Sequence, residues 1–401
     1  MARDRIARNR YQPCLAIQPR RMIIALGHTM DNHGYSSLLE FNSDTGALMN
    51  NETRIAVVGA GLIGQTHIET IARTPQAVLA AIVEPSEQGT EIAKNFQTPL
   101  YRDLGAMIAA GGIDGAIVAT PNSTHLPVAE ALLNAGIPVL LEKPVAQSLE
   151  AAARLVSVTR SNDAPLLVGH HRRHNPLIKA ARQAISQGAI GDLVVANVVT
   201  TLMKPDPYFD TAWRRSAGSG GPLLINLIHE VDLIRHFFGE VAEAQAQVAN
   251  TRRGLEVEES AAVSLRLESG ALVGMTISDA ASGPWAWDLT AGENPTRFPS
   301  HPVSAHHYAG SAGGLSLPDL TLWRHPGAPD WMTEMVPSKL PVDPADPYIA
   351  QLKHFIDVIA GRDVPLITAA DGSANMACIE AILEAARTGR TTRVDLSSLE
   401  G

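Results

Sequence analysis

The sequence predicts an α/β protein with two domains: a Rossmann domain built on a doubly wound parallel sheet, and a C-terminal α+β domain with an open antiparallel sheet. From Arg54 onward, short apolar strands alternate with helical patterns, which is typical of a parallel sheet covered on both faces. A G-x-G-x-x-G segment follows the first of these strands. Beyond Pro176 the strands become longer and partly alternating, and short turns join them, which indicates antiparallel hairpins.

The length of the chain fits this arrangement, because 401 residues accommodate two domains of ordinary size. We expect the dinucleotide-binding domain over residues 51–175 and a substrate-binding domain over residues 176–401. Residues 1–50 are rich in arginine and are expected to form a disordered extension. The twin arginine at 20–21 invites an export interpretation, but the apolar run that follows is too short for a signal peptide. Met49 would make a natural start, so the translation of residues 1–48 stays open.

Composition argues against several classes of protein. Hydrophobic residues make up 45% of the chain and charged residues 18%, as in globular proteins. The formal net charge is −9 and no basic run stands out beyond the N-terminus, which argues against nucleic-acid and membrane partners. No apolar run is long enough to span a bilayer. Cys14 and Cys378 cannot make a disulfide framework or a thiolate metal site, so a reducing, cytoplasmic setting is expected.

The first domain is predicted from five short strands separated by helices. The strands are expected at Arg54–Gly59, Val78–Glu84, Gly115–Thr120, Pro138–Glu142 and Pro165–Gly169. The helices are expected at Leu62–Arg73, Ser86–Asn95, Leu104–Ala110, His125–Ala135 and Ser148–Thr159. This alternation of strand and helix predicts the doubly wound sheet.

The second domain is predicted from a different pattern of elements. Its strands are expected at Leu193–Leu202, Val241–Asn250, Glu259–Glu268 and Leu272–Asp279. Its helices are expected at Leu177–Gln187, Leu223–Phe238, Tyr348–Ala360 and Gly372–Thr388. We expect the last two helices to pack back on the first domain.

The glycine-rich turn after the first strand predicts a dinucleotide site. Gly59 permits a tight turn, Gly61 lets the backbone approach a pyrophosphate, and Gly64 lets the helix pack closely. The start of that helix, with Leu62 and Ile63, supplies N–H donors and a favourable dipole. A plain strand-turn-helix is the alternative interpretation of the same segment.

Glu84 at the end of the second strand predicts the choice of cofactor. A carboxylate there accepts hydrogen bonds from the ribose hydroxyls and repels a 2′-phosphate. No arginine or lysine follows immediately in the sequence to hold that phosphate, so NAD is favoured over NADP. The alternative is a surface glutamate that caps the turn before Pro85 and Ser86.

Lys143 is the sharpest candidate for chemistry. It ends an apolar strand at the edge of a parallel sheet, between an acid and a proline, where ligands meet such sheets. An ammonium group at that place would stabilise a developing alkoxide, or polarise a carbonyl in the reverse direction. The alternative is a surface lysine before a turn proline.

Two segments together resemble the Gfo/Idh/MocA family, named for glucose-fructose oxidoreductase and inositol dehydrogenase. They are the strand that ends in Glu-Lys-Pro at Val139–Pro144 and the glycine-rich segment Ile55–Gly64. The resemblance covers nearly everything from Met49 to the C-terminus. It implies an NAD-dependent dehydrogenase, dimers or tetramers, and a cis peptide bond before Pro144.

The resemblance also implies further contacts to the cofactor. The segment Thr120-Pro121-Asn122 is similar to the one that lines the nicotinamide side in the family through backbone contacts. We add His125, Glu142 and Lys143 to the expected cofactor set, although His125 is interpreted mainly as a structural histidine at the start of its helix. An Asn122 or Ser123 side chain that caps this helix is the local alternative, and both roles can coexist.

The glycine-rich turn before the Leu223–Phe238 helix resembles the family's catalytic helix, whose pattern is D-x-x-x-H-x-x-D. His229 matches the catalytic histidine, a group able to take a proton near neutral pH, and Asp232 matches the final acid. Ile225 stands where the family has its first aspartate, and Asn226 follows it. An amide cannot relay a proton, so we interpret Asn226 as a group that positions His229. A packed helix histidine is the alternative.

Substrate contacts are expected from polar groups near Arg173, where the chain is expected to form a hinge between the two domains. They are also expected from aromatic rings that suit the C–H face of a sugar. The expected residues are Arg173, Trp213, Arg214, Asp232 and Trp285. The histidine-rich run at residues 170–174 is tempting as a metal site. No nearby cysteine or acid pair completes a ligand set, so no metal is expected.

Together these observations predict an oxidoreductase that transfers hydride from a secondary alcohol of a sugar, cyclitol or related polyol to NAD. His229 would accept the hydroxyl proton and Lys143 would support the alkoxide. A glycoside hydrolase that uses NAD on the same scaffold and a non-catalytic dinucleotide-binding regulator stay open. A homo-oligomer, dimer or tetramer, is expected through the open sheet of the second domain. The particular sugar, the carbon and the direction of reaction do not follow from the sequence.

Overall fold

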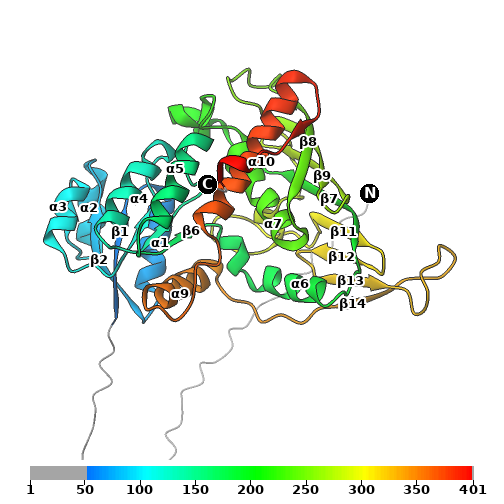
Figure 1. The fold of residues 1–401 in the computed structure, drawn as a ribbon, viewed down its shortest axis with the longest axis horizontal. Helices are drawn as coiled ribbons and strands as arrows, with labels where there is room; N and C mark the ends of the chain where they lie inside the picture. Colours follow the sequence, from blue (N-terminus) through cyan, green and yellow to red (C-terminus); the bar gives the residue numbers. More distant parts are fainter. Residues whose placement is uncertain (1–51, 400–401) are drawn as a thin grey trace, which may run out of the picture. The chain divides into compact units, whose positions relative to one another are not determined.

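The computed structural model describes residues 52–399, so the extension expected over residues 1–50 lies outside the described part. Two β-sheets organise the described residues, and helices pack on both (Figure 1). The first sheet holds the N-terminal strands and the second holds most of the later ones. Within residues 52–399, no helix combines the length and the apolar character that crossing a membrane requires.

The first sheet is fully parallel, with the strand order β3-β2-β1-β4-β5-β6. This order confirms the predicted Rossmann sheet. Its strands are β1 (Thr53–Val58), β2 (Ala77–Val83), β3 (Leu100–Tyr101), β4 (Gly115–Val118), β5 (Val139–Leu141) and β6 (Leu166–Val168). Every residue of β4, β5 and β6 is buried, which explains why these strands are apolar throughout. The edge strand β3 was not predicted, because two residues carry no periodic signal.

Five helices connect these strands close to the predicted positions. They are α1 (Leu62–Ala72), α2 (Gln88–Asn95), α3 (Leu104–Ala110), α4 (His125–Asn134) and α5 (Leu149–Arg160). Side-chain caps start two of them: the Asp103 carboxylate accepts from the Ala106 N–H, and the Ser148 hydroxyl accepts from the Ala151 N–H. A one-turn 3₁₀ helix, η1 (Asn122–Thr124), leads into α4.

The second sheet has nine strands in the order β14-β13-β12-β11-β7-β10-β9-β8-β15. They are β7 (Leu193–Thr201), β8 (Val241–Ala249), β9 (Ser260–Leu267), β10 (Leu272–Ser278), β11 (His306–Gly310), β12 (Gly314–Leu317), β13 (Thr321–Arg324), β14 (Val336–Lys339) and β15 (Thr392–Arg393). Most neighbours pair antiparallel, and β7 with β10 pairs parallel. The predicted β9–β10 hairpin is confirmed, and Gly270 turns it with a φ of 89°. The sheet is therefore mixed, although mostly antiparallel.

Strands β11 to β15 were not predicted from the sequence. Each is five residues or shorter, and every residue of β14 is exposed, so no alternation of apolar and polar residues marks it. In contrast, β9 and β10 alternate buried and exposed positions along their length. One face of this part of the sheet is therefore covered and the other is open.

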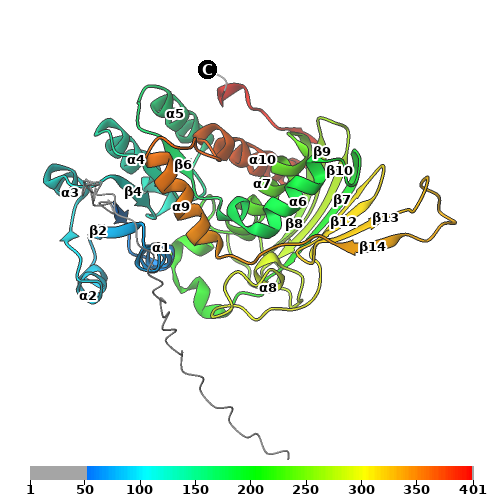
Figure 2. The same ribbon diagram turned by 90° about the horizontal axis from the view of Figure 1, so that it is seen from below.

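Helices cover one face of the second sheet, as Figure 2 shows for α6 and α7. These helices are α6 (Pro176–Ser186), η5 (Leu223–Leu227), α7 (Ile228–Phe238) and the short α8 (Trp287–Thr290). The predicted helix at 223–238 thus begins as a π-helical turn, η5, before it becomes α-helical. Four 3₁₀ turns complete this part: η2 (His171–His174), η3 (Asp206–Asp210), η4 (Ala212–Arg215) and η6 (Ser397–Leu399).

The two late helices contact both halves of the described chain. They are α9 (Pro347–Ile359), which packs against α1, and α10 (Ala369–Thr388), which packs against α5, β6 and β8 (Figure 1). A glycine permits the close approach of α10, because a Cβ at Gly372 would overlap Val145 and lie 3.2 Å from Val168. Helix α10 therefore holds the two sheets together.

We predict that Gly372→Ala destabilises the protein. The added methyl group would overlap the buried Val145, and overpacking of this kind costs about 1–3 kcal/mol. Gly105→Ala on α3 is the matched control, because its Cβ meets only ordinary contacts at 3.4 Å and alanine favours a helix. Urea unfolding should give a lower free energy of unfolding for the first variant and not for the second. Equal values for both variants would contradict the close packing of α10.

Candidate active site

The glycine-rich turn lies where the strand order of the parallel sheet reverses, between β1 and β4, which is where such sheets bind ligands. Gly59 has a φ of 91°, and a Cβ there would lie 2.7 Å from the Ala119 carbonyl oxygen. At Gly64 a Cβ would overlap the Gly59 carbonyl oxygen. Gly61 instead faces open space, with no atom within 4 Å of an added Cβ, and α1 starts there without a side-chain cap. Free N–H groups beside open space fit the pyrophosphate of a dinucleotide.

Glu84 follows β2 and faces the same turn. Its carboxylate accepts hydrogen bonds from the Ala60 N–H at 2.8 Å and from the Ser86 N–H at 3.0 Å. Burial alone would raise the pKa of Glu84, but these hydrogen bonds lower it below the ordinary 4.5. Glu84 is therefore ionised at neutral pH, and it both caps its own turn and faces the glycine-rich loop.

Arg102 lies beside Glu84, although no arginine or lysine follows that acid immediately in the sequence. Its guanidinium donates to the Glu84 carbonyl at 3.3 Å, to the Ser86 carbonyl, and to the Thr90 hydroxyl at 2.7 Å. Arg102 follows the unpredicted strand β3, and the pairing of β3 with β2 brings it here. Both an acid and a cation therefore flank the place where a ribose would bind.

His125 ties the loop after β4 to the turn after β5. Its Nδ1 lies 2.7 Å from the Pro144 carbonyl oxygen and its Nε2 lies 2.9 Å from the Thr120 carbonyl oxygen. Burial lowers the pKa of His125 despite these two carbonyls. The peptide bond between Lys143 and Pro144 is cis, as the family resemblance implied. Pro121 and Asn122 continue this loop, with Pro121 exposed and Asn122 half-buried.

Lys143 reaches from the end of β5 to the second domain. Its Nζ donates a hydrogen bond to the Ile225 carbonyl oxygen in η5 at 3.1 Å. Within residues 52–399 no carboxylate lies within ion-pair distance of this ammonium. Burial lowers the pKa of Lys143 below the ordinary 10.5, and the nearby Glu142 opposes that shift. Glu142 itself pairs with His67 at 2.8 Å.

The π-helical turn η5 lets the main chain of Ile225 contact Lys143, at the position where the family has its first aspartate. Residue 225 meets Lys143 through its main-chain carbonyl, so an isoleucine side chain is tolerated there. Such turns widen a helix locally and occur often at functional sites. The hydrogen bond therefore ties the Lys143 side chain to the first turn of the helix that carries His229.

His229 is buried beside Lys143 and two other histidines. Its ring packs edge-to-face against His170 and His171, with centroid distances of 5.8 and 5.4 Å. Its Nδ1 is buried without a hydrogen-bond partner in the described part of the chain. Burial, followed by the charges of Lys143 and Arg172, lowers the pKa of His229 well below 6.5. The imidazole is therefore neutral at pH 7 and able to accept a proton.

Neither Asn226 nor Asp232 contacts His229 by a hydrogen bond. The Asn226 side-chain oxygen accepts from the Lys204 ammonium at 2.8 Å. The Asp232 carboxylate accepts from Arg173 and from Asn375. Direct positioning of His229 by Asn226 is therefore not what the structure shows, and the neighbouring rings position it instead.

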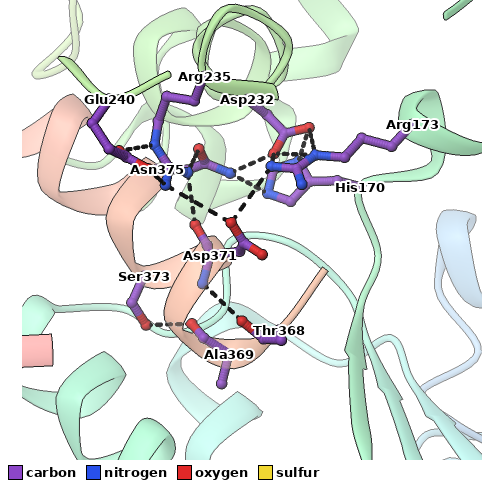
Figure 3. A network of polar contacts seen from close by, with 10 residues as sticks. All are labelled: His170, Arg173, Asp232, Arg235, Glu240, Thr368, Ala369, Asp371, Ser373 and Asn375. Carbon is purple, nitrogen blue, oxygen red and sulfur yellow. Dashed lines mark hydrogen bonds and ion pairs between the residues drawn. The ribbon is translucent and has the colours of Figure 1, made fainter. Parts of the chain in front are cut away.

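Arg173 and Asp232, both expected at the substrate, form a buried ion pair with each other (Figure 3). The guanidinium donates to both carboxylate oxygens, at 2.7 to 3.1 Å, and the side chains are 6% and 1% exposed. Asn375 of α10 donates to the same carboxylate at 2.7 Å and accepts from Arg235 at 2.6 Å. This network joins the segment after β6 to α7 and α10, and it leaves neither residue free for a ligand.

The aromatic candidates lie near the segment that follows β7. Trp213 and Trp285 are 42% and 46% exposed, so both rings are accessible. The Arg214 guanidinium lies 4.2 Å from the centre of the Tyr208 ring, and the Lys204 ammonium lies 4.8 Å from the same centre. The Trp285 carbonyl accepts from the Thr201 N–H at the end of β7. Tyr208 thus links Arg214 and Trp213 to Lys204, and through it to Asn226.

The histidine-rich run does not converge on one point. His170 faces Asn375 at 3.1 Å, His171 faces Glu293 at 3.3 Å, and His174 packs against His354. Among residues 52–399 no group of three or more His, Cys, Asp or Glu side chains is arranged to hold a metal ion.

Two further residues near this site, Lys204 and Arg172, were not predicted from the sequence. Lys204 carried a usable signal, because Lys204-Pro205 repeats at the end of β7 the lysine-proline pattern of Lys143-Pro144. Arg172, which pairs with Glu230 at 2.7 Å, gave no local signal, since its partner lies far away in the chain.

Comparison with known proteins agrees with this geometry. Residues 53–170 match the profile described as oxidoreductase family, NAD-binding Rossmann fold, and residues 178–293 match the GFO/IDH/MocA C-terminal domain. A 1,5-anhydro-D-fructose reductase of Ensifer adhaerens is 28% identical over 85% of this chain and 98% of its own length. An inositol 2-dehydrogenase of Saccharopolyspora erythraea is 28% identical over 86% of this chain and 96% of its own.

Solved structures share the fold over most of the chain. Levoglucosan dehydrogenase in complex with NADH and levoglucosan superposes with a TM-score of 0.72 at 20% identity, over 85% of this chain and 99% of its own. An oxidoreductase from Agrobacterium radiobacter in complex with NAD+, L-tartaric acid and magnesium gives 0.71 at 22% identity, over 86% and 98%.

We predict that Glu84→Ser shifts affinity from NADH toward NADPH. The substitution removes the charge that repels a 2′-phosphate, and Arg102 is already in place to pair with it. The double variant Glu84→Ser with Arg102→Ala is the control, because it lacks both groups. Fluorescence titration with each reduced cofactor measures the ratio of dissociation constants. A single variant that still excludes NADPH, or a double variant that binds it equally well, would contradict the role given to Arg102.

Proposed function

Because the chain belongs to the Gfo/Idh/MocA family of oxidoreductases, we propose that it is an NAD-dependent dehydrogenase acting on a secondary alcohol of a sugar, cyclitol or related polyol. The observation that carries the proposal is the meeting of Lys143 and His229. Lys143 comes from the Rossmann sheet and bonds to the helix on which His229 lies, and burial followed by the Lys143 charge lowers the pKa of that histidine. An ammonium beside a neutral imidazole suits the removal of a hydroxyl proton.

The relatives support this class of substrate. Their names refer to inositol and to anhydrofructose, and one structure with the same fold holds levoglucosan. All of these ligands are polyhydroxylated rings or their ketones. The exposed rings of Trp213 and Trp285 offer flat apolar surfaces for such a ring.

NAD fits the residues of the first domain. The uncapped start of α1 and the open space at Gly61 would hold the pyrophosphate, and the ionised Glu84 would accept from the ribose hydroxyls. We propose NAD over NADP because Glu84, rather than Arg102, bonds directly to the glycine-rich loop. Its carboxylate cannot donate a hydrogen bond to a 2′-phosphate and repels that group. When bound, the nicotinamide supplies the acceptor for hydride.

The chain's own residues handle the proton and the charge. His229 is neutral at pH 7 and accepts the proton of the substrate hydroxyl. The Lys143 ammonium stabilises the negative charge that develops on the oxygen. Burial, followed by the positive charges of Lys143 and Arg172, lowers the pKa of His229. The same two cations favour an alkoxide beside the histidine. The buried network that Asp232 forms with Arg173 and Asn375 holds this arrangement in place.

We also propose that the protein forms a dimer or tetramer through the open face of the second sheet. Outward positions of β9 and β10 are exposed along their length, and several are small, including Ala262, Gly274 and Thr276. Exposed apolar side chains accompany them at Val195 and Leu272.

We predict that Lys143→Met abolishes most turnover but spares cofactor binding. Methionine keeps the volume and removes the charge, so kcat for NADH formation should fall by roughly 10²–10³. His229→Ala should lose on the order of 10²–10⁴, the scale of a general base. Lys353→Met, an exposed lysine on α9, is the matched control and should keep the wild-type rate. The measurement is the rate of NADH formation from sugars or inositols. Near-normal turnover in the Lys143 variant would show that this lysine is only a turn residue.

The pH profile of oxidation follows from the two shifted groups. His229 must be neutral, and its pKa lies well below 6.5, so the rate should already be on its plateau at pH 6.5. Lys143 must be protonated, and its lowered pKa should make the rate fall before pH 10.5. Initial rates from about pH 5 to about pH 10.5 measure both limbs. An alkaline limb that survives unchanged in Lys143→Met would show that another group titrates.

A further inference from the structure

Lys204 is a buried lysine that the proposed mechanism does not use. It lies just beyond β7, and its side chain is 8% exposed. Its ammonium donates to the Asn226 side-chain oxygen at 2.8 Å and lies 3.3 Å from the Asp279 carboxylate. A lysine is expensive to bury, so one held at the centre of a site needs a reason.

The contact with Lys204 decides which way the Asn226 amide points. An ammonium group only donates, so the amide oxygen must face Lys204 and the amide nitrogen must face away. No acceptor within the described residues binds that nitrogen, and the Asn226 side chain is half-buried rather than enclosed. Two N–H donors are therefore free for a ligand.

These donors lie beside the groups proposed to act on the substrate. Ile225, the preceding residue, binds the Lys143 ammonium through its carbonyl, and His229 follows three positions later on the same helix. Two ammonium groups thus contact consecutive residues of one helix. Asp279 also binds Arg253 at 2.6 Å, so the one carboxylate that pairs with Lys204 among residues 52–399 is shared with a second cation.

We propose that Lys204 and the Asn226 amide form a subsite for a carboxylate group, so that the substrate is a sugar acid rather than a neutral sugar or inositol. This inference rests on the proposed function, because it names the substrate class of that same site. Asn226 would touch the carboxylate, and Lys204 is the positioning residue that turns the amide toward it and adds positive charge.

The chemistry of the subsite favours a carboxylate over a hydroxyl. A carboxylate only accepts hydrogen bonds, and the two groups proposed to form the subsite, the Asn226 amide nitrogen and the Lys204 ammonium, only donate. A hydroxyl brings a proton that neither of these two groups can accept, which costs affinity in a half-buried place. An aspartate at position 225 would repel an anion, and this chain has Ile225 there instead.

Binding, rather than turnover, gives the sharpest test. Calorimetry on the full chain saturated with NADH would compare D-glucuronate with D-glucose, and D-galacturonate with D-galactose. The acid of at least one pair should bind about 10- to 100-fold more tightly than its neutral partner, which is the range for hydrogen bonds to a charged group. Equal affinity within both pairs, or no binding of either acid, would overturn the inference.

Variants of the two residues separate this role from a structural one. Asn226→Asp keeps the size but replaces donors with an anion, so the preference for the acid should vanish or invert. Lys204→Met frees the amide to turn and should reduce the preference, while Lys204→Arg should restore much of it and Lys353→Met should leave it unchanged. Each variant should first show a cooperative thermal transition. An unchanged preference in a folded Asn226→Asp or Lys204→Met protein would also overturn the inference.

Binding measured by calorimetry and NADH formation measured on the same sugars together distinguish the two proposals. A preference for the acid that depends on Asn226 supports the subsite even if no sugar reduces NAD, and that absence would refute the dehydrogenase. Conversely, NADH formation from neutral sugars, with no preference for acids in binding, supports the dehydrogenase and refutes the subsite.

Discussion

The buried ion pair between Arg173 and Asp232 is the interaction on which the rest of the site depends. Two charges removed from water are tolerated only when they satisfy each other, and here the guanidinium meets both carboxylate oxygens. Asn375 completes the carboxylate from α10. Because Arg173 follows the last strand of the Rossmann sheet and Asp232 lies on α7, the pair locks the two domains in one register. Loss of either partner would leave an uncompensated buried charge, so this register is strongly held.

That register brings the chemistry together. Asp232 lies one turn beyond His229, so anchoring its carboxylate also holds the turn of α7 that carries the histidine. Lys143 then reaches the same helix from β5 and bonds to a main-chain carbonyl. Burial affects the two groups in the same direction, since it disfavours the charged form of each. The result is a neutral imidazole beside an ammonium that has no carboxylate within ion-pair distance in the described part of the chain, which is a suitable environment for an alkoxide.

The departure from the family pattern at position 225 changes the polarity of the site. An aspartate there would add an acceptor and a negative charge. In this chain the carbonyl of Ile225 accepts from Lys143, and the next side chain, Asn226, is turned by Lys204 so that its donors are free. The substitution therefore does more than remove a proton relay, because it replaces an anionic position with a donor position. The π-helical turn makes this possible, since it presents the main chain of residue 225 to Lys143.

The Rossmann sheet, the glycine-rich turn, and the positions of Lys143 and His229 at the end of a strand and on a helix were predictable from the sequence. These features depend on local periodicity and on short motifs, which are present in any one stretch of the chain. The short strands β11 to β15 and the π-helical turn were not predictable, because they are too short or too exposed to leave a periodic signal. Tertiary packing places Arg102 beside Glu84, pairs Arg173 with Asp232, and lets Lys204 orient Asn226. Each of these contacts joins residues from different elements, so the order of strands and the packing of helices set them, and no spacing in the sequence encodes that order.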